Sequence, residues 1–276
     1  MKVTELQNRM AALQRHLDPE PQEQLDPVSW VAERLGLTLD QWQKDLLLAD
    51  PHRLLLLTPR QSGKSTTVGA LAAVRMVDRP GSRVVVLSPS QRQSTLLTAK
   101  VLDCLRDESL ERESAQVVAH VNGSVLHSLP GDRPATVRGV TADLVIVDEA
   151  SRVRDELIAA CFPMVASTDG GLMMLSTPAG QSGQFYSAWI DETGEWQKVR
   201  VSLADVSHYS PGVLKTMRRR LGPRVFSQEF ENVFLDLPGA LFSGDVLDRL
   251  FSRPDPIKPD ETWAPLGAQT EEWTPL

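Results

Sequence analysis

Residues 53–66 constrain the fold of this chain more than any other run, and they read Arg-Leu-Leu-Leu-Leu-Thr-Pro-Arg-Gln-Ser-Gly-Lys-Ser-Thr. The four consecutive leucines, Leu54 to Leu57, predict a strand buried on both faces, because a strand with one wet face would alternate apolar and polar residues. A short loop follows, and Gly63-Lys64-Ser65-Thr66 then opens a segment with helical spacing. This order of strand, loop and helix is typical of a phosphate-binding P-loop.

In such a loop, backbone N–H groups and the positive end of a helix face a phosphate chain. Lys64 would reach the β and γ phosphates of ATP, and the Ser65 hydroxyl would hold Mg²⁺. The complete pattern has glycine six positions before the lysine, where this chain has Thr58. We therefore predict a nucleotide site with an irregular loop, against the alternative of an ordinary strand, turn and helix.

A pair of acids supplies the second half of the predicted site. Four apolar residues, Leu144 to Val147, lead directly into Asp148 and Glu149. This pattern predicts a buried strand whose carboxyl end carries both carboxylates, at the edge of the sheet where α/β proteins bind ligands. Asp148 would hold Mg²⁺, usually through water, and Glu149 would orient and polarise an attacking water. Together with Lys64, the pair favours ATP hydrolysis over nucleotide sensing.

The composition is ordinary for a globular protein, with 41% hydrophobic and 24% charged residues among 276. That length suits one large domain, or one domain with a small appendage. No apolar run approaches the length of a membrane span, so we expect no membrane partner. The net charge of −7 argues against a protein that coats nucleic acid over its whole surface, but it allows a local basic site.

The remaining patterns predict an α/β fold with a mainly parallel sheet flanked by helices and joined by right-handed crossovers. Further strands are expected at 83–87, 172–175 and 198–203, and Asn122-Gly123 predicts a hairpin between residues 116–121 and 124–129. Thr38 and Gln41 are expected to form a capping box before a helix. The expected helices cover residues 41–48, 65–77, 91–106, 210–221 and 224–233.

Four segments are expected along the chain. Residues 1–34 would hold an N-terminal helix and a linker, residues 35–205 the P-loop core, residues 206–250 a small helical lid, and residues 251–276 a tail. The helix predicted over residues 2–17 has a narrow apolar seam. That seam would pack on its own domain or contact another subunit.

Several motifs in the same order resemble the large terminase subunits of tailed bacteriophages, which are DNA-packaging motors. The P-loop with Arg60-Gln61 before Ser62 is similar to the irregular loop of that family, in which Thr58 in place of glycine is expected. Gln43 resembles the adenine motif, Val137-Arg138-Gly139 the segment before the acidic strand, and Ser176-Thr177-Pro178 the coupling motif. Gly239–Ser243 resembles the exit from the ATPase domain, so the likeness covers roughly residues 35–245.

The resemblance implies a P-loop NTPase of the RecA-like (ASCE) type that hydrolyses ATP with Mg²⁺ to drive double-stranded DNA into a procapsid. Its implied partners are the portal protein, the small terminase subunit and further copies of itself in a ring, a pentamer, in the host cytoplasm. The family's C-terminal nuclease domain, of RNase H-like fold, is not expected in this chain. The residues expected around the nucleotide are Gln43, Arg60, Gln61, Ser62, Gly63, Lys64, Ser65 and Thr66.

Two arginines are candidates for stabilising the transition state, beside Glu149 as the residue that activates water. The resemblance implies that Arg138 reaches the nucleotide of a neighbouring subunit, and Arg60 would sense or order the nucleotide of its own subunit. For each, a surface arginine that binds a carbonyl is the alternative. Ser176, Thr177 and Pro178 would sense the γ-phosphate and relay hydrolysis to the surface that grips DNA.

Contacts to DNA are expected from Gln91, Arg92 and Lys100, and they should involve phosphates rather than base edges. Residues 215–224 hold five cations that would contact DNA phosphates, reach a neighbour's nucleotide or form a solvated helix face. Two alternative functions remain: a superfamily 2 helicase-like DNA translocase, and a nucleotide-dependent assembly module. The helicase would need a second RecA-like domain, for which the residues after Leu203 are too few.

Overall fold

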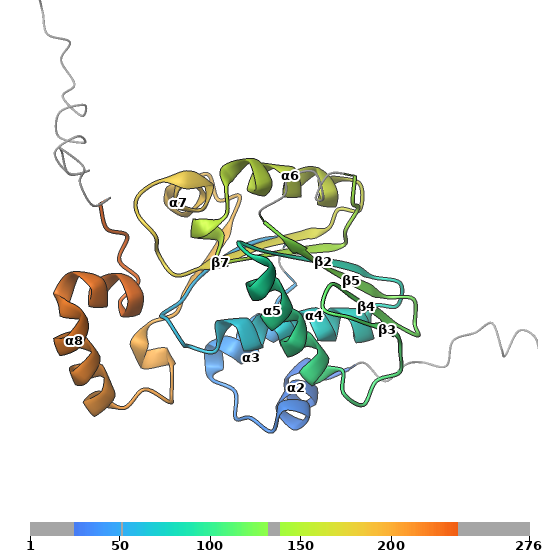
Figure 1. Ribbon diagram of the computed structural model, residues 1–276, viewed down its shortest axis with the longest axis horizontal. Coiled ribbons are helices and arrows are strands. Elements are labelled where there is room, and N and C mark those ends of the chain that lie inside the picture. The colour runs from blue at the N-terminus through green and yellow to red at the C-terminus, as the bar shows by residue number, and fades with distance from the viewer. Residues whose placement is uncertain (1–24, 51, 132–138, 237–276) are drawn as a thin grey trace, which may run out of the picture. The chain divides into compact units, whose positions relative to one another are not determined.

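The computed structural model describes residues 25–50, 52–131 and 139–236 (Figure 1). The chain divides into two compact units, Met1–Leu235 and Asp236–Leu276, and the sheet belongs to the first. The predicted α/β class is confirmed by this eight-stranded, mainly parallel sheet. In spatial order its strands are β3 (Leu110–Glu113), β4 (Val117–His120), β5 (Val125–Pro130), β2 (Arg83–Ser88), β6 (Leu144–Asp148), β7 (Gly171–Ser176), β1 (Arg53–Leu57) and β8 (Gln197–Arg200).

Helices cover both faces of the sheet, as Figure 1 shows. One face carries α2 (Pro27–Leu35), α3 (Gln41–Leu48), α4 (Lys64–Asp78) and α5 (Gln91–Cys104), and the other carries α6 (Asp155–Ala166) and α7 (Gly183–Ile190). The leucines of β1 divide between the two layers: Leu54 and Leu56 join the core on the α4 side, and Leu55 and Leu57 join the core on the α6 side. All four are fully buried, so the predicted double-faced strand is confirmed.

The predicted hairpin is also confirmed, and the sheet has one further strand beyond it that the sequence did not indicate. β4 and β5 pair antiparallel around Asn122-Gly123, and Gly123 has a φ of 87° that favours glycine. The Asn122 amide donates to the carbonyl of Met76 at 2.8 Å, which ties the turn to α4. The short strand β3 pairs antiparallel with β4 at the edge and was not predicted.

Two expectations at the start of the core are wrong in detail. The capping box of α3 is formed by Asp40 and Gln43 rather than by Thr38 and Gln41, with Asp40 N donating to Gln43 Oε1 at 2.8 Å. The helix α2 was not expected; Asp26 caps it, Pro27 occupies its first turn, and its Val31 is buried in the main core. The boundary predicted after residue 34 therefore falls inside a helix that packs on the core.

The first unit closes with α8 (Pro211–Phe230), in which Gly222 has φ 75° and ψ 164°. This break at Gly222-Pro223 confirms the predicted division into two helices. β8 ends at Arg200, three residues before the end of the predicted strand, and a short 3₁₀ turn follows over Leu203–Asp205. None of the helices in the described part of the chain is long and apolar enough to cross a membrane. The predicted N-terminal helix and Gly239–Ser243 lie outside the described residues, and the lid and tail boundaries stay predictions.

Candidate nucleotide-binding site

The strand order brings the predicted motifs to one edge of the sheet. β7 lies between β1 and β6, with Leu57 beside Ser176 and Asp148 beside Leu175. Because these strands are parallel, their carboxyl ends meet at the same edge, where α/β proteins bind ligands. Ser176 at the end of β7, and the loop that begins with Thr177-Pro178, therefore lie between the P-loop and the two acids.

The P-loop bounds an open cavity of about 370 Å³. Gly63 precedes α4 with a φ of 92°, which favours glycine, and a Cβ there would lie 3.1 Å from Gln43 Nε2, so a larger residue would also push the Gln43 amide aside. Gln61 also has a positive φ, of 61°. The lining of the cavity consists of Pro59, Arg60, Gln61, Ser62, Gly63, Lys64, Ser65, Thr66, Glu149 and Thr177.

Lys64 and the two acids form a compact charged cluster. Lys64 Nζ donates to Glu149 Oε1 at 2.7 Å and lies 3.2 Å from Asp148 Oδ1. Burial raises the pKa of Asp148, and the neighbouring Glu149 adds to the rise while Lys64 opposes it. One buried ammonium therefore faces two carboxylates, and the cluster carries an excess of negative charge that a metal ion would balance.

The oxygens around this cluster fit Mg²⁺, which prefers oxygen ligands and keeps several waters. Asp148 and Ser65 would hold it, and buried Glu149 Oε2 and Thr177 Oγ1 have no hydrogen-bond partner among the described residues. Within that part of the chain no group of three or more His, Cys, Asp or Glu side chains forms a metal cage. A cation at this site would thus need waters or phosphate oxygens to complete its coordination.

The backbone at Glu149 is strained. Glu149 has φ 51° and ψ 43°, a left-handed conformation that costs a non-glycine residue about 1–3 kcal/mol. Its N–H donates to Asp148 Oδ1 at 3.0 Å. This left-handed residue ends β6 and begins the 3₁₀ turn over Ala150–Arg152, and the Glu149 side chain lies on the wall of the cavity.

Gln43 lies against the P-loop, but both ends of its amide are already bound. Its Oε1 accepts from Asp40 N, and its Nε2 donates to Thr67 Oγ1 at 2.8 Å. The residue is 9% exposed, and its amide packs against Gly63. In this arrangement Gln43 joins α3 to the first turn of α4, and its contact with adenine stays a prediction.

The predicted coupling motif connects the two halves of the site. Thr58 N donates to the carbonyl of Ser176 at 3.2 Å, and the Ser176 hydroxyl accepts from Ser151 N at 3.2 Å. Thr177 follows and lines the cavity. The residues after β1, β6 and β7 are thereby linked by hydrogen bonds, with Pro178 buried next to them.

Arg60 has a partner that the sequence did not reveal. Its Nε lies 2.6 Å from Glu229 Oε2, and its backbone N–H donates to the carbonyl of Glu229 at 2.7 Å. Arg152, three residues after Glu149, lies 3.8 Å from the other carboxylate oxygen. Glu229 and Arg152 had no motif to single them out, because their role depends on how α8 docks. Arg138 lies outside the described residues.

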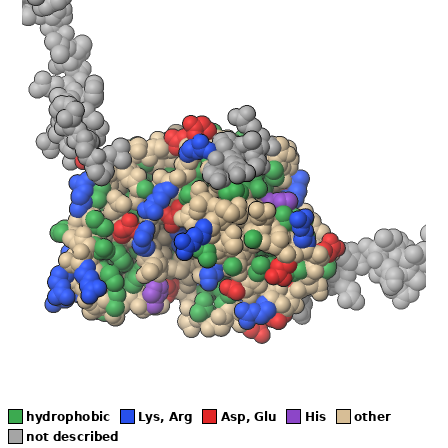
Figure 2. Space-filling model, in the orientation of Figure 1, with side chains coloured by type: hydrophobic (Ala, Val, Ile, Leu, Met, Phe, Trp, Pro, Cys, Tyr) green, Lys and Arg blue, Asp and Glu red, His purple; other side chains and the backbone are tan. Residues whose placement is uncertain are grey.

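The residues expected to contact DNA are only partly brought together. Gln91 and Arg92 open α5 directly after the carboxyl end of β2, whereas Lys100 lies farther along the helix and pairs with Asp103 at 3.7 Å. Lys and Arg side chains are prominent over α8 in Figure 2. Among them Arg218 pairs with Glu231 and stacks its guanidinium on Phe226. The predicted DNA contacts stay predictions.

The fold and the site together define a P-loop nucleotide-binding protein. Residues 55–249 match the family described as "Terminase large subunit, T4likevirus-type, N-terminal", and the chain belongs to this family of terminase large subunits. The suspected resemblance is thus confirmed.

Known relatives agree with that assignment. The large terminase subunits of Thermus phage G20c and Thermus virus P23-45 are each 26% identical over 179 residues, which span 56% of this chain and 37% of the relative. The solved ATPase domain of the Thermus phage P74-26 large terminase matches with a TM-score of 0.65 and 23% identity, covering 76% of this chain and all of that domain.

A more distant structure, the large terminase of another thermophilic bacteriophage in complex with ADP, matches with a TM-score of 0.62 and 12% identity. The match covers 71% of this chain and 54% of that protein. The same terminase has also been solved in complex with ATP-γ-S. At these identities the structural matches establish the fold.

Proposed function

We propose that this chain is the ATP-hydrolysing motor domain of a terminase large subunit, which drives double-stranded DNA into a procapsid. The observation that supports it most is the convergence of Lys64, Asp148 and Glu149 within 2.7–3.2 Å at the carboxyl edge of the sheet. Membership of the terminase family supports the same activity, as do the ADP and ATP-γ-S complexes of the distant terminase.

We propose a residue for each step of hydrolysis. The N–H groups of the P-loop and the start of α4 would bind the phosphate chain, and Lys64 would turn from Glu149 to the β and γ phosphates. That exchange frees Glu149 to orient and polarise the attacking water. Mg²⁺, held by Asp148 and Ser65, would neutralise charge on the phosphate oxygens.

The partners of the motor follow from the family and belong to the proposal. They are double-stranded DNA, the portal protein, the small terminase subunit and further copies of this chain in a pentameric ring on the procapsid, in the host cytoplasm. Arg138 would complete the nucleotide site of the neighbouring copy, and Gln91, Arg92 and Lys100 would contact the DNA backbone. Ser176, Thr177 and Pro178 would sense the γ-phosphate and relay hydrolysis to the surface that grips DNA.

Phosphate release measured over a range of protein concentrations, with and without DNA, tests the proposal. A shared site predicts a steep rise of specific activity with concentration, and Arg138→Ala should lower turnover on the order of 10³-fold while ATP still binds. Turnover that is absent under all conditions, with ATP bound, would instead favour the nucleotide-dependent assembly module. Specific activity that is constant at every concentration would argue for a self-contained site.

A further inference from the structure

The carboxylate of Glu229 joins three parts of the molecule. Glu229 stands in the last turn of α8 with its side chain only 13% exposed. It pairs with Arg60 of the P-loop and, at longer distance, with Arg152 of the turn that follows Glu149. Since its backbone carbonyl also accepts from Arg60 N, this one residue holds Arg60 by both its main chain and its side chain.

Other residues of the same segment hold the outer side of the P-loop. The Tyr209 hydroxyl donates to the carbonyl of Arg60, and His208 Nε2 lies 2.9 Å from the carbonyl of Gln61. The ring of Tyr209 packs edge-on against Phe230, next to Glu229. The segment from His208 to Phe230 is thus docked on the two loop residues that precede Ser62.

Arg60 stands between two sources of negative charge. Its side chain is 53% exposed and belongs to the lining of the P-loop cavity, yet its Nε is paired with Glu229. The planar fork of a guanidinium fits both carboxylate and phosphate, so phosphates in the cavity would compete with Glu229 for it. Glu229 itself would repel those phosphates, because nearby like charges disfavour each other.

We infer that Glu229 competes with the nucleotide phosphates for Arg60, and that nucleotide binding releases the end of α8 from the P-loop. The inference rests on the proposed nucleotide site and adds a positioning residue to it, since Glu229 acts through Arg60. Coupling of this kind is reciprocal: whatever holds α8 against the loop weakens nucleotide binding by the same factor that the nucleotide weakens the docking.

Glu229→Gln tests the competition, because glutamine keeps the shape and removes the charge. We expect the dissociation constant for MgATP to fall roughly two- to fivefold, the range that a half-exposed ion pair allows. Glu231→Gln is the matched control: Glu231 lies on the same helix end and pairs with Arg218 instead of the P-loop. Its affinity should equal that of the wild type. In an Arg60→Gln background the gain from Glu229→Gln should shrink, because the contested partner is gone.

Hydrogen exchange separates this role from a structural one. ATP-γ-S should speed hydrogen exchange in residues 223–231 of the wild type. In Glu229→Gln and Arg60→Gln, exchange there should already be fast without nucleotide, and ATP-γ-S should increase its rate little. A Glu229→Gln variant whose affinity for MgATP is equal to or below that of Glu231→Gln would overturn the inference. The inference would also be wrong if ATP-γ-S left the rate of hydrogen exchange in residues 223–231 of the wild type unchanged. A wild type that binds no MgATP would overturn the proposed function as well.

Discussion

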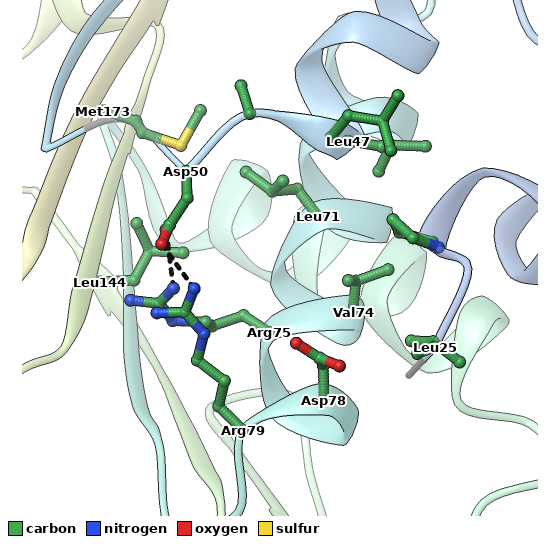
Figure 3. A pocket seen from close by; sticks show the side chains of 13 residues that line it. Leu25, Leu47, Asp50, Leu71, Val74, Arg75, Asp78, Arg79, Leu144 and Met173 are labelled. Atoms are coloured by element: carbon green, nitrogen blue, oxygen red, sulfur yellow. Dashed lines mark hydrogen bonds and ion pairs between the residues drawn. The ribbon is translucent and has the colours of Figure 1, made fainter. Parts of the chain in front are cut away.

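Helix α4 carries a charged cluster at each end, and the two clusters are built in opposite ways. At its start one cation, Lys64, faces the carboxylates of Asp148 and Glu149. At its end two cations, Arg75 and Arg79, share the single carboxylate of Asp50. Figure 3 shows this second cluster on the wall of a cavity of about 220 Å³, among the apolar side chains of Leu47, Leu71 and Val74.

The surroundings of the two clusters also differ, in backbone strain and in unpaired polar atoms. The start of α4 is flanked by backbone with positive φ at Gln61 and Glu149 and by buried oxygens without partners in the described part of the chain. At the other end, the cations lie at the negative end of the helix dipole, where they are favoured. Strained backbone and an excess of negative charge thus lie where a ligand is to bind, whereas the other end of the helix carries an excess of positive charge that the helix dipole favours.

The largest expected effect comes from a substitution of Glu149, the acid proposed to activate water. Glu149→Gln should lower ATP turnover by about 10²- to 10⁴-fold, because an amide cannot take a proton from water. ATP should still bind, since Lys64 and the P-loop are unchanged. Turnover and nucleotide affinity measured on the same sample check both halves. Arg75→Gln is the control at the opposite end of the helix, and it should leave turnover near that of the wild type; a large loss there would erase the contrast between the ends.

A smaller effect concerns stability at the same cluster. Asp148→Asn should raise the free energy of unfolding at neutral pH by about 1 kcal/mol, because it removes a buried charge whose ionised form is disfavoured. The raised pKa of Asp148 means that its penalty appears as the pH rises from the ordinary aspartate pKa toward the raised value, and it is absent below about pH 4. Urea unfolding at neutral and acid pH measures the difference. A variant that is less stable than the wild type at neutral pH would show that Lys64 needs both acids.

Asp50→Asn, at the other end of α4, should act with the opposite sign. Partial burial alone would raise the pKa of Asp50, but hydrogen bonds and charge from Arg79 and Arg75 outweigh it and lower the pKa. The carboxylate therefore stabilises the fold above the ordinary aspartate pKa, about 4, and this contribution is lost as the pH falls through the lowered value. We expect a loss of about 0.5–1 kcal/mol at neutral pH that disappears in acid. An equal loss of stability at both pH values would mean that the shape of the Asp50 side chain, and not its charge, stabilises the fold.

The sequence predicts the elements best where one local rule decides. The leucines of β1, the Asn122-Gly123 turn and the break at Gly222 each have a single physical reading, and each is confirmed. The helices α2, α6 and α7 were not predicted, and each is short, with 9, 12 and 8 residues. The capping box forms at Asp40 and not at the predicted Thr38, because both residues are acceptable caps and lie close together. The hydrogen bond from Gln43 to Thr67, a tertiary contact, favours the box at Asp40.

The candidate site divides in the same way. Lys64, Asp148, Glu149 and Thr177 could be predicted because each lies at or just after the carboxyl end of a strand in a parallel sheet, and the structure brings them together. Glu229 could not be predicted, since nothing local marks an acid near the end of a distant helix as the partner of Arg60. Unlike Asp148 and Glu149, Glu229 does not follow a buried strand, so no local pattern marks it.

The smallest expected effect distinguishes the two arginines that share Asp50. The Arg79 side chain is 48% exposed, whereas the Arg75 side chain is 15% exposed and also donates to the carbonyl of Asp143. Arg79→Ala should therefore cost at most about 0.5 kcal/mol of stability, because an exposed ion pair is offset by solvent and side-chain entropy. Thermal unfolding at low and high salt measures it, and the small loss should vanish in high salt. A salt-independent loss of more than about 1 kcal/mol would mean that Arg79 is needed for packing around the cavity, and that charge alone does not explain how this end of the helix is held.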